Sequence, residues 1–160
     1  MDRKKNWKSE LILRGRQDPA WWVESVLGGN LWEKQKEICE ALVKYERVAV
    51  AGAFGFGKTF LAARLMLWFL LCHPNSKVVS TAPTQRQVKD LLWSELRAAH
   101  AKAIMPLGGE LLQLQYKLGE DHFAVGFSTD SENIDRFTGY HAPHQLVVFD
   151  QAGGIDSPIW

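Results

Sequence analysis

The residue types best suited to chemistry lie together in one glycine-rich segment, Gly52-Ala53-Phe54-Gly55-Phe56-Gly57-Lys58-Thr59. This segment fits the pattern G-x-x-x-x-G-K-T at every specified position. The oxygens of a triphosphate need several backbone N–H groups that converge from a tight loop, and glycines allow such a backbone to approach the ligand closely. Lys58 would then reach the β- and γ-phosphates, and the hydroxyl of Thr59 would bind Mg²⁺. The segment therefore predicts a phosphate-binding loop (P-loop) for ATP and Mg²⁺.

A carboxylate at the end of an apolar run is the second candidate. The run Leu146-Val147-Val148-Phe149 is followed directly by Asp150. This pattern is typical of the strand that presents a metal-binding aspartate in P-loop proteins, although many buried strands also end in aspartate. Its position downstream of a P-loop makes the functional interpretation stronger. We expect Asp150 to hold Mg²⁺ through its water shell, opposite Thr59.

Gln151 stands where P-loop enzymes that hydrolyse ATP commonly carry a glutamate that polarises the attacking water. Glutamine has the same size but cannot accept the proton. Two explanations are open: the chain hydrolyses ATP poorly by nature, or a glutamate was replaced to trap the bound nucleotide. The otherwise intact motif favours the second explanation. With either explanation, we expect weak turnover.

Two more side chains are candidates for the same site. Gln35 has a paired donor and acceptor that could read an adenine edge, but the residue type alone favours an exposed helix glutamine. Arg136 lies in a polar loop and could serve as an arginine finger, in cis or from a neighbouring subunit. A solvated loop arginine is the commoner role for such a residue.

The elements that must position these residues follow from the hydrophobic pattern. Asp18-Pro19 and Gly28-Gly29 bound a first helix, and Asn30 with Glu33 makes a loose capping box for a second helix over 33–45. Further helices are predicted to begin near Lys58 and at Pro83. Buried strands are predicted at 48–51, 77–81 and 146–149, and a hairpin at 111–116 and 122–127.

Alternation of strands and helices predicts an α/β fold, here a P-loop NTPase of the ASCE type. We expect a largely parallel sheet with helices on both faces, an N-terminal helical segment and a β-hairpin insertion. Residues 1–46 would form the helical segment that carries Gln35, and residues 47–160 the ATPase core. Ligands bind such sheets at the carboxyl ends of the strands, where the two motifs fall.

Composition excludes several other classes of protein. The chain has 160 residues, 46% of them hydrophobic, and suits one domain with a real core. Its net charge of +1 gives no strong global field, although Arg86, Lys89 and Arg97 could form a basic stripe. Cys39 and Cys72 have no partner at metal-ligand spacing and are expected to be buried, reduced thiols. The longest apolar run is too short to span a bilayer, so no membrane partner is expected.

Taken together, the motifs resemble the ATPase domain of tailed-bacteriophage large terminase subunits. The most specific part is Arg136-Phe137-Thr138-Gly139-Tyr140-His141-Ala142-Pro143, followed by Phe149-Asp150-Gln151-Ala152-Gly153-Gly154. The family shows a similar R-F-x-G-Y-H run leading into D-E-A-G-G. The adenine-motif region is similar to Asp18-Pro19-Ala20-Trp21-Trp22 and Trp32-Glu33-Lys34-Gln35, and Thr81-Ala82-Pro83-Thr84 also fits in order. The resemblance covers nearly the whole chain from Asp18 onward.

This resemblance implies an ATP-powered motor that packages double-stranded DNA into a procapsid in the host cytoplasm. Such a motor works as a homo-oligomeric ring on the portal and also has a small terminase subunit as its partner. By position, Gln35 is similar to the adenine contact, Lys58 to the phosphate contact, and Thr59 and Asp150 to the metal contacts. Gln151 stands at the place of the catalytic glutamate. Some relatives carry a trans-acting arginine in the region of Arg136, although the local match is imperfect.

The chain departs from the family pattern at its end as well as at Gln151. It stops at Trp160, before the family's coupling motif and nuclease domain, so we expect a fragment without nuclease activity. One alternative is a superfamily 2 helicase or DNA translocase, which shares the upstream glutamine, the P-loop, the T-A-P-T segment and the acidic motif. The R-F-x-G-Y-H run favours terminase. A second alternative is a non-hydrolysing, nucleotide-gated binding module in which Gln151 is the native residue.

Overall fold

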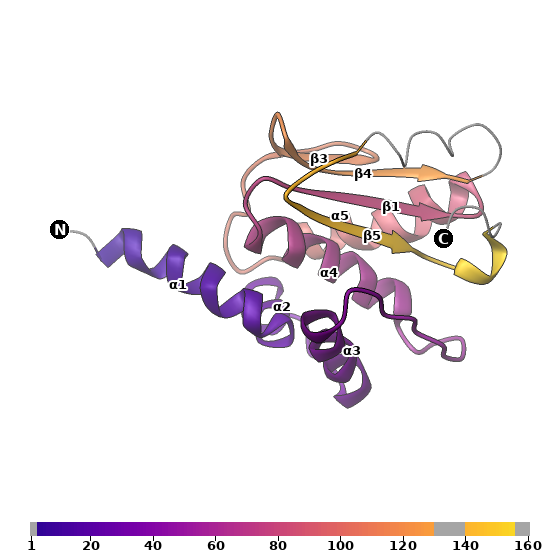
Figure 1. The fold of residues 1–160 in the computed structure, drawn as a ribbon, viewed down its shortest axis with the longest axis horizontal. Coiled ribbons are helices and arrows are strands. Elements are labelled where there is room, and N and C mark those ends of the chain that lie inside the picture. The colour runs from indigo at the N-terminus through magenta and orange to yellow at the C-terminus, as the bar shows by residue number, and fades with distance from the viewer. Residues whose placement is uncertain (1–2, 130–139, 156–160) are drawn as a thin grey trace.

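The first part of the chain is helical in the computed structural model, which describes residues 3–129 and 140–155 (Figure 1). Its helices are α1 (Arg3–Gln17), α2 (Pro19–Leu27) and α3 (Glu33–Lys44). The predicted bounds of α2 are confirmed, because the Trp21 N–H donates to the Asp18 carboxylate at 2.9 Å and Gly28 ends the helix with φ +69°. The predicted capping box of α3 is wrong: Trp32 is the N-cap, so Asn30 lies two residues too early to cap this helix.

Helix α4 (Lys58–Cys72) follows the glycine-rich loop, as predicted, and is apolar on nearly all sides. It lies between the N-terminal helices and the sheet (Figure 1). The Trp68 indole donates to the Gly15 carbonyl at 2.6 Å, and the Arg16 guanidinium donates to the Cys72 carbonyl at 2.6 Å. These two bonds fix the end of α1 to α4.

Five strands form one mixed sheet in the order β2-β3-β4-β1-β5. They are β1 (Ser76–Ala82), β2 (Glu110–Leu111), β3 (Gln115–Gly119), β4 (His122–Ser128) and β5 (His144–Phe149). β1 pairs in parallel with β4 and β5, whereas β3 pairs antiparallel with β2 and β4. The expectation of a largely parallel sheet is therefore not confirmed. The predicted hairpin is present as β3–β4, but β4 joins the parallel pairs beside β1 and so belongs to the main sheet.

Residues 48–51 form no strand, so the strand predicted before the P-loop is wrong. Val50 is 40% exposed, and β5 is the last strand of the sheet on this side. Apolar and β-branched residues favour a strand only where a neighbouring strand completes the backbone hydrogen bonds. Among the described residues, no strand pairs with this segment.

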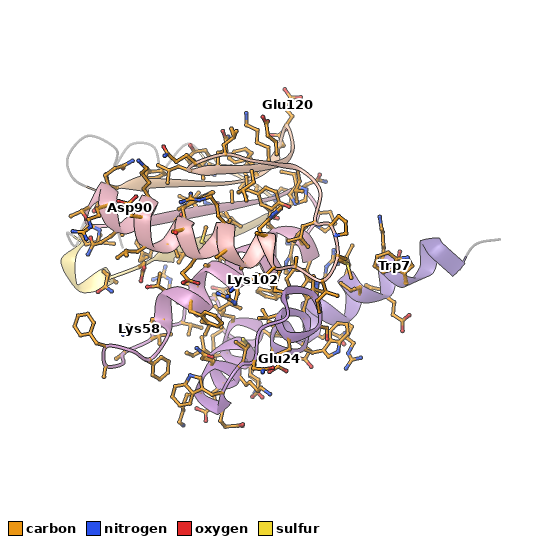
Figure 2. All side chains as sticks on the ribbon, turned by 180° about the vertical axis from the view of Figure 1, so that it is seen from behind. Trp7, Glu24, Lys58, Asp90, Lys102 and Glu120 are labelled. Atoms are coloured by element: carbon orange, nitrogen blue, oxygen red, sulfur yellow. The ribbon has the colours of Figure 1, made fainter. Side chains whose placement is uncertain are left out.

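The helices that contact the sheet lie on one of its faces. The helix predicted after Pro83 begins as a π-helix, η1 (Gln87–Leu92), and continues as α5 (Trp93–Ala101). α4 and α5 lie behind the sheet in Figure 1 and in front of it in Figure 2, and they pack against each other. The Trp93 indole donates to the Ser80 hydroxyl at 2.9 Å, which ties α5 to β1. Within the described residues, the expected helical layer on the opposite face is not present.

Of the helices described in residues 3–129 and 140–155, none is long and apolar enough to cross a membrane.

Candidate nucleotide-binding site

The glycine-rich segment forms a loop that enters α4 at Lys58, which Figure 2 shows at the start of that helix. Gly57 is the N-cap of α4 with φ +82°, and Gly55 has φ +83°. Both conformations lie in the left-handed region that side chains with a Cβ rarely adopt, so these two glycines are needed where they stand. The loop therefore leads its backbone to the positive end of a helix, as an anion site requires.

Lys58 bends back over the loop. Its ammonium donates to the Gly52 carbonyl at 2.6 Å and to the Ala53 carbonyl at 3.1 Å. These carbonyls are neutral acceptors, whereas a phosphate oxygen is charged and binds an ammonium more strongly. The lysine is thus held at the mouth of the loop by contacts that an anion would replace.

Thr59 and Asp150 are in direct contact, although 91 positions separate them in the chain. The Thr59 hydroxyl donates to Asp150 Oδ2 at 2.9 Å, and only 5% of Asp150 is exposed. The backbone N–H of Asp150 donates to the Thr81 carbonyl at 2.9 Å, and this bond continues the β1–β5 ladder past the end of β5. Hydroxyl and carboxylate oxygens are ligands that Mg²⁺ accepts, so this pair fits the predicted metal. Among the described residues, no group of three or more His, Cys, Asp or Glu side chains could hold a metal.

Gln151 lies on an exposed turn directly after Asp150. It has φ +57° and ψ 42°, an uncommon backbone conformation for a residue other than glycine. Its N–H donates to Asp150 Oδ1 at 3.1 Å, and a short 3₁₀ turn follows over Ala152–Gly154. Gly154 lies against Pro83, since a Cβ there would be 2.8 Å from the proline Cγ. This contact joins the turn that carries Gln151 to the segment that follows β1.

Gln35 is buried beside the loop, so the interpretation as an exposed helix glutamine is wrong. It is 4% exposed and its Nε2 lies 3.5 Å from the carbonyl oxygens of both Phe56 and Gly57. Its Oε1 accepts the Trp32 N–H at 3.4 Å. The structure thus brings Gln35 together with the P-loop, and its role toward adenine stays a prediction.

Trp32 lies beside the loop, and the sequence analysis names it only as part of the adenine-motif region, with no role of its own. Its ring centroid lies 4.7 Å from that of Phe56, edge to face, and the residue is 48% exposed. Phe54 at the tip of the loop is fully exposed. The signal available in the sequence was the position of Trp32, three residues before Gln35 and therefore one helical turn from it.

Arg136 lies outside the described residues, so its role as an arginine finger stays a prediction. In the possible basic stripe, Arg97 donates to the Gln113 carbonyl at 2.8 Å and to the Lys89 carbonyl at 3.3 Å, and the stripe stays a prediction. Cys39 and Cys72 are confirmed as buried and free thiols.

Fold and site together define an α/β protein with a mixed sheet and a glycine-rich loop at a helix N-terminus. Near that loop, a threonine of the helix bonds an aspartate at the end of β5. Comparisons of this chain with family models, with curated proteins and with solved structures found no match.

Proposed function

We propose that this chain is a P-loop NTPase domain that binds ATP with Mg²⁺ and belongs to a viral DNA-packaging motor of the large-terminase type. The observation that carries the nucleotide-binding part is the 2.9 Å contact between Thr59 and Asp150. It brings the last residue of the G-x-x-x-x-G-K-T pattern to a nearly buried carboxylate at the end of an apolar strand. A glycine-rich turn that fits this pattern by chance would have no reason to meet such a carboxylate.

In the proposed mechanism, the backbone N–H groups of the loop and the first turn of α4 bind the phosphates. Lys58 exchanges its contacts with the Gly52 and Ala53 carbonyls for phosphate oxygens. Thr59 and Asp150 would hold Mg²⁺ with their oxygens, and the ion would supply positive charge that neutralises the phosphates. Asp150 is positioned for this by the Thr81 carbonyl, which holds its backbone in line with β1.

Gln151 limits the chemical step. An amide can orient a water molecule through hydrogen bonds but cannot take its proton, so hydrolysis is slow in this chain. Arg136 is the proposed arginine finger, acting in cis or on a neighbouring subunit.

The motor function rests on the resemblance to terminases. This resemblance implies that double-stranded DNA is the translocated substrate and that the portal and the small terminase subunit are partners. It also supplies a homo-oligomeric ring as the working form and the host cytoplasm as the place of action. The same reasoning leaves a superfamily 2 helicase or translocase as the nearest rival.

A second candidate function is a nucleotide-gated binding module that does not hydrolyse ATP. The residue that favours it is Gln151 itself, which follows an otherwise well-formed Thr59–Asp150 pair. In such a module, ATP would be bound and held, and the bound state would control a partner.

Steady-state ATP hydrolysis with Mg²⁺ and double-stranded DNA separates these functions. Three proteins are compared: the parent chain, the Gln151→Glu variant, and a double variant, Gln151→Glu with Lys58→Ala, as the blank. The motor proposal expects Gln151→Glu to hydrolyse ATP at least about a hundredfold faster than the given chain, because a general base contributes roughly 10²–10⁴-fold. If both the parent chain and Gln151→Glu bound ATP and neither hydrolysed it, the result would favour the gated module.

A further inference from the structure

Positive charge is concentrated in helix α1. This helix holds six of the chain's 19 lysines and arginines but only one of its 18 aspartates and glutamates. The net charge of α1 is therefore +5, which leaves −4 for the rest of a chain whose total is +1. A basic helix on an otherwise acidic protein is typical of a segment that binds a polyanion.

The last turns of α1 attach the helix to the body of the protein. Gly15 is buried there, and the ring of Trp22 lies so close that a Cβ on residue 15 would collide with it. The Arg16 guanidinium donates to a carbonyl at the end of α4, and that of Arg14 lies 3.9 Å from the centroid of the Trp21 ring. Both arginines of these turns therefore help to hold the helix in place.

The first turns of α1 extend beyond the other helices and the sheet (Figure 1), and Figure 2 shows Trp7 on this projecting part. Lys4, Lys5 and Lys8 fall within about 100° around the axis of the helix, because 3.6 residues make one turn. Glu10 stands two positions after Lys8 and hence on the opposite side of the helix. The projecting part therefore has one face that carries three lysines and no acid, here called the lysine face.

A nucleic-acid backbone fits the lysine face better than a membrane does. A helix that lies on a membrane needs one continuous apolar face. The exposed apolar side chains of α1 are Trp7 and Leu13, which are six positions apart and so stand on different sides, while Leu11 packs on the hydrophobic core. Duplex DNA carries one negative charge per about 1.7 Å of its axis. Lys4 and Lys8 lie about 6 Å apart along α1, so they can meet different phosphates.

We infer that α1 is a surface that binds the phosphate backbone of duplex DNA through Lys4, Lys5 and Lys8. Contacts to phosphates carry no sequence information, so α1 holds any duplex with similar affinity. The negative charge on the rest of the chain confines the DNA to this helix. The choice of duplex DNA as the polyanion rests on the proposed function, whereas the charge argument does not depend on nucleotide binding.

The experiment follows the fluorescence anisotropy of labelled duplex DNA of mixed sequence, without nucleotide, at increasing salt concentration. The test variant combines Lys4→Gln, Lys5→Gln and Lys8→Gln, since glutamine and lysine have similar helix propensities. Each neutralised phosphate contributes about −0.9 to the slope of log K against log[salt]. We expect the triple variant to bind at least about tenfold more weakly near 0.1 M salt, with a slope shallower by about 2.7. If it does not fold, Lys8→Gln alone changes one exposed side chain and should make the slope shallower by about 1.

A matched control removes three positive charges from other elements. It combines Lys44→Gln, Lys102→Gln and Lys117→Gln, which change exposed lysines. This control should bind the duplex nearly as the parent chain does. An equal loss in the control would assign the effect to total charge and overturn the inference. Unchanged affinity and salt slope in the α1 variants would also overturn it.

Two other polyanions test the choice of partner. The parent chain is mixed with vesicles that contain phosphatidylserine and, separately, with polyglutamate, at the same salt concentration. We expect both to bind more weakly than the duplex. Binding to the vesicles or to polyglutamate without binding to the duplex would overturn the inference, in favour of a membrane or an acidic protein. If the parent chain bound no ATP, the proposed function would fail, while the DNA measurement would still decide the role of α1.

Discussion

Replacing Thr59 by valine removes one hydroxyl and keeps the shape of the side chain. Asp150 Oδ2 then loses the donor that lies 2.9 Å away, while Oδ1 keeps the Gln151 N–H at 3.1 Å. Because Asp150 is only 5% exposed, water cannot freely replace the lost bond. A hydrogen bond to a charged group contributes about 1.5–3 kcal/mol, and we expect the free energy of unfolding to fall by that amount. For a chain of this size, the midpoint of thermal unfolding should fall by about 3–12 °C.

The assay is thermal unfolding followed by circular dichroism, without nucleotide and without Mg²⁺. Thr59→Ser is the control, because it keeps the hydroxyl and loses only a methyl group, and it should change the midpoint much less than Thr59→Val. With nucleotide present, Thr59→Val should also lose most of the gain in affinity that Mg²⁺ gives the parent chain. Equal midpoints for the parent chain and Thr59→Val would refute the contact between Thr59 and Asp150, and with it the argument for the site.

Two further predictions concern the body of the fold. Gly126→Ala should reduce the free energy of unfolding in urea by about 1–3 kcal/mol, because a methyl group at this position would collide with the buried indole of Trp93. Gly153→Ala, where nothing lies within 4 Å of the added methyl group, should change it little, and equal losses would contradict the packing of α5 on β4. Burial raises the pKa of the Cys39 and Cys72 thiols to about 12 each. At pH 8 roughly one thiol in ten thousand is then ionised, so thiol reagents should label the native protein far more slowly than the urea-unfolded protein, and similar rates would contradict this burial.

Much of the local structure follows from short-range signals in the sequence. Asp18-Pro19 and Gly28 bound α2 because capping and left-handed turns depend on neighbouring residues alone. The short, β-rich runs at 77–81 and 146–149 likewise predict β1 and β5, and the end of β5 places Asp150 within reach of Thr59. The pairing of these two residues could be predicted because each motif fixes the position of its side chain: Thr59 in the first turn of a helix, and Asp150 directly after a strand.

The failures depend on contacts between distant segments. Residues 48–51 have the composition of a strand, but that composition says nothing about whether a neighbour is present to pair with them. The mixed sheet was missed for a similar reason, since the sequence predicts the β3–β4 hairpin and not that β4 would lie beside β1. The burial of Gln35 and the ring contact of Trp32 could not be predicted, because their partners lie on the loop, more than twenty residues away in the case of Gln35.

The central claim is that residues 52–59 bind the phosphates of ATP, and calorimetric titration of the protein with MgATP tests it most directly. We predict saturable binding at one site per chain that weakens by at least about tenfold in Lys58→Ala, because that variant loses a charged partner of the phosphates. Lys102→Ala, which removes an exposed lysine at the end of α5, should bind as the parent does. Absence of binding to the parent chain, or equal affinity in the parent and Lys58→Ala, would contradict the claim.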